Sequence, residues 1–203
     1  TILRRNHGGL LRRTPQGGVE ITAAGRDEWV GSLELIDQTV GLAAVRHTAR
    51  VINEVNADVL AVVEAESRPA LVAFNQQTIG AIGAPYRSVM VIDGNDERGI
   101  DVGLMTRPGY GIEQMRSHVD DLGADGTPIF RRDCPEYHLE TPSGQSLVVL
   151  VNHFKSKGWG SAASSSRIRR AEAARVAEIV QHLGDTGHAH IAVVGDFNDT
   201  PGS

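Results

Sequence analysis

An apolar strand that ends in a dense polar cluster is the segment of this sequence with the clearest chemical potential. Residues 191–194 are apolar and lead through a glycine to Asp196 and Asn198. If the strand stays extended, side chains two residues apart emerge on one face, so the carboxylate and the amide stand side by side. A carboxylate can ligate a hard cation or handle a proton, and an amide can hold a water or phosphate oxygen without charge repulsion. An ordinary turn rich in Asp and Asn is the alternative interpretation.

A second strand end carries a histidine followed by lysines. The apolar residues 147–151 lead to Asn152, His153 and Lys155. His153 and Lys155 share a face as long as the strand persists. An imidazolium can donate to a phosphate oxygen and an ammonium can neutralise developing charge, which suits phosphoryl transfer. We include Asn152 as a further candidate for contacting the substrate, and a purely structural histidine is the alternative.

A third apolar strand, residues 59–63, delivers Glu64 at its carboxyl end. Mg²⁺ is commonly held by one or two carboxylates together with water and substrate phosphate, so a single glutamate here fits a nuclease-type site. The alternative is an ordinary surface or helix-capping glutamate. Glu66 precedes a Ser-Arg-Pro sequence and is better explained as the entry to a helix over residues 69–80.

Helices and strands alternate around these three polar groups. Apolar residues at helical spacing predict amphipathic helices over residues 43–56 and 168–183, the second ended by Gly184. Continuous apolar runs predict strands over residues 58–64 and 191–194 that are covered on both faces. These elements must deliver the polar residues to a common place.

One pair of strands has the signature of a hairpin. Residues 136–140 and 146–153 flank the sequence Thr-Pro-Ser-Gly-Gln, which is typical of a turn. Because an antiparallel hairpin lies among helix-strand units, a two-sheet sandwich with helices outside is favoured over an all-parallel sheet.

The composition describes one globular domain. The chain has 203 residues, 40% of them hydrophobic, and we assign residues 1–203 to a single domain. Its apolar runs are strand-sized, below the roughly 18 residues that a membrane-spanning helix needs. A formal net charge of −5 argues against a nucleic-acid binder that works through bulk positive charge, although local basic clusters exist. The single cysteine, Cys134, excludes an intramolecular disulfide framework and favours a reducing compartment such as the cytoplasm, while the localisation stays open.

Taken together, the strand ends match a family pattern. The sequence resembles the endonuclease/exonuclease/phosphatase superfamily, which has the deoxyribonuclease-like fold, over residues 28–203. Four motifs carry the resemblance, in the order of the family: ADVLAVVEAE (57–66), RGIDVGLMTR (98–107), VLVNHFKSKG (149–158) and VVGDFNDTP (193–201).

This resemblance implies a fold, a cofactor and residue roles. The expected fold is a four-layer α/β/β/α sandwich of two mixed, largely antiparallel sheets, with one cleft that holds Mg²⁺ or Mn²⁺. Glu64 falls where the family keeps its metal-binding glutamate, and His153 where related enzymes place a histidine that contacts the scissile phosphate. Asp196 and Asn198 fall on the pair that orients the attacking water and stabilises the transition state, and Lys155 would add charge stabilisation.

Two features depart from the family pattern. The family opens with a strand that carries an asparagine near the metal, but the strand-like residues 29–36 carry Glu34 there. Glu34 is either a second metal ligand or a solvent-facing strand residue. The chain stops at Ser203, before the family's last strands and their aspartate-histidine pair. We therefore expect a sandwich incomplete at its C-terminal side and little activity of this chain alone. We also expect either self-association through an exposed sheet edge or a covering element from elsewhere in the chain. Residues 1–24 are expected to form a hairpin or extension, with a basic lip over the cleft as the alternative.

The leading functional hypothesis is a divalent-metal-dependent phosphodiester hydrolase of the nuclease type, with a phosphoester such as nucleic acid as its substrate. A phosphomonoesterase acting on a small or lipid-derived phosphate is the alternative within enzymes. A non-catalytic binding or scaffold domain that retains the fold is the alternative from another class, and metal binding near Glu64 and Asp196 separates the two.

Overall fold

The computed structural model describes residues 2–25, 27–34, 41–96, 98–157 and 161–200, with residues 2–6 and 32–34 described by their backbone alone. The chain forms two compact units, Thr1–Val45 and Arg46–Ser203. No helix among the described residues is long and apolar enough to cross a membrane.

The described residues of the first unit contain two antiparallel strand pairs. They are β1 (Ile2–Gly8) with β4 (Trp29–Glu34), and β2 (Leu11–Arg13) with β3 (Val19–Ile21). The second pair is a hairpin, and its turn is closed by hydrogen bonds from the Gly18 N–H to the Thr14 hydroxyl (2.9 Å) and from the Thr14 N–H to the Gly18 carbonyl (2.9 Å). Residues 2–24 thus contribute one strand and one complete hairpin.

The second unit contains two sheets and the helices that cover them. One sheet has the order β5-β7-β6 and is antiparallel throughout; the other has the order β11-β10-β9-β8 and is antiparallel except for β10 and β11. The strands are β5 (Val59–Ala65), β6 (Ser88–Ile92), β7 (Asp101–Thr106), β8 (Gly111–Arg116), β9 (Glu136–Glu140), β10 (Ser146–His153) and β11 (Ile191–Asp196). The helices are α1 (Leu42–Val55), which begins in the last residues of the first unit, α2 (Arg68–Phe74) and α3 (Ala162–Asp185), with a π-helical segment, η1 (Asn75–Ile79), after α2.

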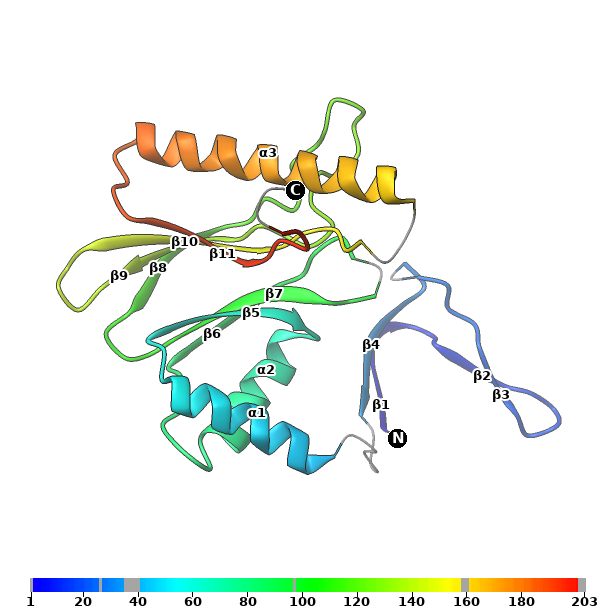
Figure 1. Cartoon of the computed structure of the whole chain (residues 1–203). Coiled ribbons are helices and arrows are strands. Elements are labelled where there is room, and N and C mark those ends of the chain that lie inside the picture. The colour runs from blue at the N-terminus through cyan, green and yellow to red at the C-terminus, as the bar shows by residue number, and fades with distance from the viewer. Residues whose placement is uncertain (1, 26, 35–40, 97, 158–160, 201–203) are drawn as a thin grey trace. The chain divides into compact units, whose positions relative to one another are not determined.

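Three apolar layers join these elements into a four-layer sandwich, in which α3 covers one sheet and α1 and α2 cover the other (Figure 1). Buried side chains of α1, α2 and η1 meet the outer face of the first sheet, and Val102 and Leu104 of β7 meet Tyr137 and Val149 of the second sheet. On the far side, α3 packs its own apolar stripe on β10 and β11. The fold class predicted from the sequence, an α/β/β/α sandwich with largely antiparallel sheets, is confirmed.

The connection between β10 and β11 matters most for the site. Parallel neighbours need a long crossover, and α3 supplies it by running back over the sheet. The helix begins at Ala162, earlier than the apolar spacing predicted, because the Ser161 hydroxyl accepts a hydrogen bond from the Ser164 N–H (3.1 Å) and caps the first turn. As a result, two strands from distant parts of the sequence end side by side.

The helix predicted over residues 69–80 is divided. It starts as α2 and continues as η1 from Asn75. There the buried Asn75 amide donates to the Tyr86 carbonyl (2.9 Å) and accepts from the Tyr86 N–H (2.8 Å). This local bonding to a loop accompanies the change of helix type, and apolar spacing carries no signal for it.

Candidate active site

The carboxyl ends of β10 and β11 bring the predicted histidine and aspartate together. The two strands pair in parallel, with His153 in register with Asp196. The His153 Nε2 lies 4.0 Å from Asp196 Oδ2. Both follow residues that pack between the two sheets, Val151 and Val194, so they face that side of the sheet edge. His153 is buried, whereas the Asp196 side chain is 53% exposed and accessible to a substrate or water.

The surroundings of His153 favour its neutral form. Burial lowers the pKa of His153, the charge of Arg132 lowers it further, and the charges of Asp196 and Glu64 offset part of the effect. Its Nδ1 is buried and makes no hydrogen bond to any described residue. A neutral imidazole can still donate one hydrogen bond to a phosphate oxygen, and an arriving anion would favour its protonation.

Asn198 closes the turn after β11 and does not continue the strand. Its φ is 51°, and its backbone N–H donates to Asp196 Oδ1 (2.8 Å) while its Nδ2 donates to the Phe154 carbonyl (2.9 Å). The extended geometry that would place Asp196 and Asn198 on one face is therefore absent. Instead, Asn198 ties the two strand ends together and fixes the Asp196 carboxylate. One N–H of its amide is left for other contacts.

A bulge in β5 sets the direction of Glu64. The pairing of β5 with β7 shifts register between Val62 and Ala65, and Glu64 has a φ of 59°. Val62 and Ala65 both pack toward the helices, so the bulge inserts an extra residue and redirects Glu64, which is exposed. Strand β5 contacts both β10 and β11, and the charge of Glu64 raises the pKa of His153 against the effect of burial. Positive φ values outside glycine are often retained where function requires them.

Asn152 and Lys155 have different surroundings from those that the sequence suggested. Asn152 follows Leu150, which packs toward α3; it is buried and its Nδ2 donates to the Leu150 carbonyl (3.3 Å). Strand alternation thus directs Asn152 away from His153, and the geometry gives no support to its contact with substrate. Lys155 lies beyond the end of β10, so it does not share a strand face with His153.

Lys155 lies instead in a basic cavity that sequence reasoning missed. The cavity has a volume of about 270 Å³, and we call it the arginine pocket, defined by Asp96, Arg98, Arg131, Arg132 and Lys155. Arg98 belongs to a motif that carried the family resemblance, and Arg131 and Arg132 are adjacent, but no spacing linked the two segments. Only their meeting in the fold could reveal the pocket.

Glu172 of α3 is a second residue that the sequence did not single out. It is 1% exposed, and its Oε2 accepts a hydrogen bond from the Lys155 N–H (2.8 Å). Burial raises the pKa of Glu172 to about 7, although hydrogen bonds from the Lys155 and Arg131 backbones act in the opposite direction. This buried carboxyl therefore links α3 to two segments of the arginine pocket.

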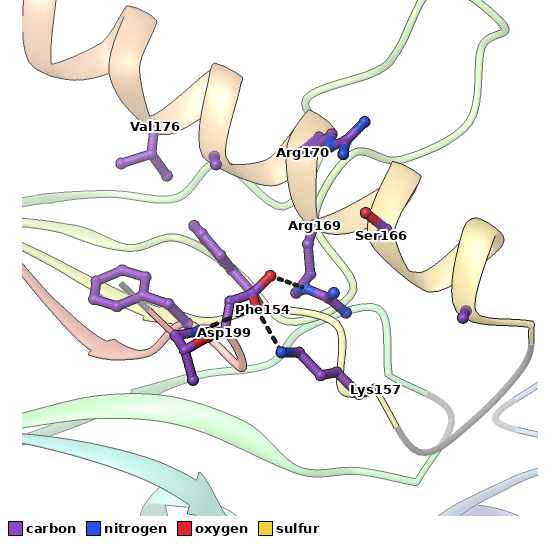
Figure 2. Close-up of a pocket in the computed structure, with 11 residues that line it drawn as sticks. Phe154, Lys157, Ser166, Arg169, Arg170, Val176 and Asp199 are labelled. Carbon is purple, nitrogen blue, oxygen red and sulfur yellow. Dashed lines mark hydrogen bonds and ion pairs between the residues drawn. The ribbon is translucent and has the colours of Figure 1, made fainter. Parts of the chain in front are cut away.

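A larger cavity of about 630 Å³ lies on the α3 side of the same strand ends (Figure 2). Phe154 and Phe197 meet edge to face on its lining, with ring centroids 5.2 Å apart. At its rim, Asp199 forms ion pairs with Lys157 (2.6 Å) and Arg169 (3.1 Å), both drawn in Figure 2. The aspartate fixes the segment after Asn198 against α3.

The possible metal ligands are few. Within the described part of the chain, no three His, Cys, Asp or Glu side chains are close enough together to hold a metal ion. Glu64 offers one exposed carboxylate, which suits a hard cation that takes its other ligands from water and phosphate. The side chain of Glu34, the second ligand considered from the sequence, lies outside the described residues; its backbone ends β4.

Comparison with known proteins assigns the family. The sequence profile of the Endonuclease/Exonuclease/phosphatase family matches residues 20–203. This chain belongs to the endonuclease/exonuclease/phosphatase family. The family predicted from the four motifs is thereby confirmed. Membership of this family supports phosphoester hydrolysis as the type of reaction. No curated protein sequence matches the chain.

Solved structures share the family fold at low identity. TDP2 from C. elegans aligns with a TM-score of 0.57 and 15% identity, over 81% of this chain and 45% of that protein. ANGEL2, a 2',3'-cyclic phosphatase, aligns with a TM-score of 0.53 and 17% identity, over 77% of this chain and 43% of that protein. The chain thus spans less than half the length of these two proteins.

Proposed function

We propose that this chain carries the catalytic centre of a divalent-metal-dependent phosphodiester hydrolase. The observation that carries the proposal is the pairing of β10 with β11, which holds His153 Nε2 4.0 Å from Asp196 Oδ2 beside a bulge that presents Glu64. Three distant segments supply a neutral imidazole and two carboxylates at one end of the sandwich. That set suits phosphoester hydrolysis, the chemistry supported by the family.

Asp196 activates the water in this proposal. Its carboxylate is exposed, and the Asn198 N–H holds Oδ1, which leaves Oδ2 to accept a hydrogen bond from water and take its proton. The water oxygen then attacks phosphorus opposite the leaving oxygen, which departs with the bond electrons. His153 donates to a non-bridging oxygen, and Lys155 adds positive charge nearby.

Glu64 is the residue that would hold Mg²⁺ or Mn²⁺. When bound, such a cation acts as a Lewis acid toward a phosphate oxygen. The strained backbone of Glu64 fits this role, because the bulge presents an oxygen ligand where an ordinary strand would direct the side chain toward the helices. Whether Glu34 is a second ligand stays a prediction.

Metal binding provides the first test, since it separates an enzyme from a scaffold without requiring turnover. We expect a calorimetric Mn²⁺ titration to give binding that Glu64→Gln weakens by roughly tenfold or more, because it removes the charged ligand. Glu66→Gln is the matched control: Glu66 is also exposed, two residues away. Absence of Mn²⁺ binding, or equal weakening by both variants, would overturn the metal assignment.

Hydrolysis provides the second test, in the natural full-length protein. Plasmid DNA, single-stranded DNA, RNA, a 2',3'-cyclic nucleotide and small phosphomonoesters are compared with Mg²⁺, Mn²⁺ and EDTA. We expect cleavage of phosphodiesters that EDTA abolishes and that Asp196→Asn lowers by about 10² to 10⁴. Exclusive cleavage of monoesters would favour the phosphomonoesterase alternative, and full activity of folded Asp196→Asn would refute the role of that residue.

A further inference from the structure

The arginine pocket is assembled from three segments that meet only in the folded chain. Asp96 and Arg98 lie between β6 and β7, Arg131 and Arg132 precede β9, and Lys155 follows β10. The cavity of about 270 Å³ can hold one compact group, and it is smaller than sites that enclose a drug-sized ligand.

The charge in this pocket is unbalanced among the described residues. Asp96 is the single acid on its lining, and it faces four basic side chains. Arg98 donates from Nε to Asp96 Oδ1 (3.0 Å) and from Nη2 to Oδ2 (2.9 Å), and Arg132 Nε lies 3.0 Å from the same Oδ2. Burial lowers the pKa of Lys155, the charges of Arg132, Arg98 and Arg131 lower it further, and the charge of Glu172 offsets part of this effect. The cations therefore repel one another, and an anion would relieve that repulsion.

The pocket is also held in place before any ligand arrives. Arg132 is 3% exposed, and its Nη1 donates weakly to the Phe154 carbonyl (3.5 Å). Burial alone would raise the pKa of Asp96, but the hydrogen bonds from Arg98 and the charge of Arg132 lower it to about 2, so this carboxylate stays ionised and keeps both guanidinium groups in place. Preorganised donors bind an anion without the cost of ordering them first.

Arg98 forms the accessible side of the pocket. Its side chain is 52% exposed, and Asp96 occupies only one edge of its guanidinium. Its Nη1 makes no hydrogen bond to the residues that the structure describes, so this edge is open to an anion. Planar guanidinium groups recognise phosphate through two parallel N–H donors.

The pocket adjoins the candidate active site. Lys155 is two residues from His153, and Arg132 Nη1 lies 3.5 Å from the carbonyl oxygen of Phe154, the residue next to His153. A ligand group in the pocket is therefore close to a phosphate held by His153, and the two groups can belong to one molecule.

We propose that the arginine pocket is a subsite for a second phosphate group of the substrate, next to the phosphate that is cleaved. The inference rests on the proposed function, because it takes His153 as the residue that contacts the scissile phosphate. The preferred substrate then carries at least two phosphates. The second one is either the next phosphodiester of a nucleic-acid strand or a terminal phosphate, and both offer the same oxygens to Arg98 and Arg131.

Three thymidine compounds test the inference. TpT carries one phosphodiester, pTpT adds a terminal phosphate, and TpTpT adds a second phosphodiester. Binding is measured by calorimetry in EDTA, so that metal-dependent turnover does not enter. We expect pTpT, TpTpT or both to bind about tenfold or more tightly than TpT, because a charge-assisted contact is gained, and we expect added salt to reduce the advantage. An advantage confined to TpTpT identifies a strand, and one confined to pTpT identifies a terminal phosphate.

Variants test whether the tighter binding of the two-phosphate compounds arises in the arginine pocket. Arg98→Gln and Arg131→Gln should each reduce it at least severalfold. Arg170→Gln, which alters a basic residue on the lining of the other cavity, should leave it intact. Equal binding of all three compounds by the wild type, or an equal loss in Arg170→Gln, would overturn the inference. These outcomes are distinct from failure of the proposed function. Metal-dependent cleavage of TpT without tighter binding of the two-phosphate compounds would refute only the subsite. Tighter binding of the two-phosphate compounds without any cleavage would support the subsite and refute the proposed hydrolase activity.

Discussion

Glu172 should make the stability of this protein depend on pH in a way that one substitution removes. The side chain is 1% exposed under α3, and burial raises its pKa from an ordinary 4.5 to about 7. Between these two values the folded chain holds a proton that the unfolded chain has lost. Stability from this group is therefore fully present below about pH 4.5 and is lost as pH rises through about 7.

The size of the effect follows from the gap between the two pKa values. A difference between 4.5 and about 7 corresponds to about 3 kcal/mol in the free energy of unfolding. Glu172→Gln has nearly the same shape, and its amide oxygen can still accept from the Lys155 N–H, but it carries no proton to lose. We expect the variant to gain about 3 kcal/mol relative to the wild type between pH 4.5 and pH 8.

Urea denaturation followed by circular dichroism at a series of pH values measures this difference. Other titrating groups contribute equally to both proteins and cancel in the comparison. Glu178→Gln is the control, because Glu178 lies on the same helix with its side chain 67% exposed. Parallel stability curves for the wild type and Glu172→Gln would refute the reasoning, since they would mean that Glu172 titrates alike in the folded and unfolded chains.

Two further predictions concern the strand ends. Gly195→Ala should destabilise the chain by about 3 kcal/mol or more in urea denaturation, because a Cβ there would lie 1.9 Å from the Asn152 carbonyl oxygen at a φ of 129°. Gly184→Ala, where a Cβ meets open space, is the control, and equal stability of the two variants would contradict the packing. Lys155→Ala should raise the KM for a phosphodiester severalfold and leave Mn²⁺ affinity unchanged, because the ammonium meets phosphate rather than the cation. An unchanged KM in steady-state kinetics would remove Lys155 from the site.

The sequence by itself determined several of the elements and the polar residues that follow three of the strands. The hairpin of β9 and β10 has the predicted bounds, because alternation and a Pro-Gly turn are local signals. The strand that became β11 was recognisable from its apolar run, and the glycine and aspartate that follow marked its chemical end. Local pattern also favoured a two-sheet sandwich over an all-parallel sheet, as the structure has it.

The tertiary structure decided which of these residues can act together. Strand alternation alone would turn Glu64 toward the helices, and only the pairing of β5 with β7 reveals the bulge that redirects it. The same dependence on partners applies to Asn198, whose side chain donates to the carbonyl of Phe154, just after the end of β10.

Burial and long-range charge are still harder to predict from the sequence. Nothing near Glu172 in the chain predicts a pKa of about 7, because the side chain is buried only in the folded chain, where it accepts a hydrogen bond from Lys155, 17 residues away. The arginine pocket likewise depends on three segments whose cations repel one another and would separate in an unfolded chain. The sequence shows which charged groups are present. Their electrostatic energies depend on the distances between them, and these distances are set only by packing.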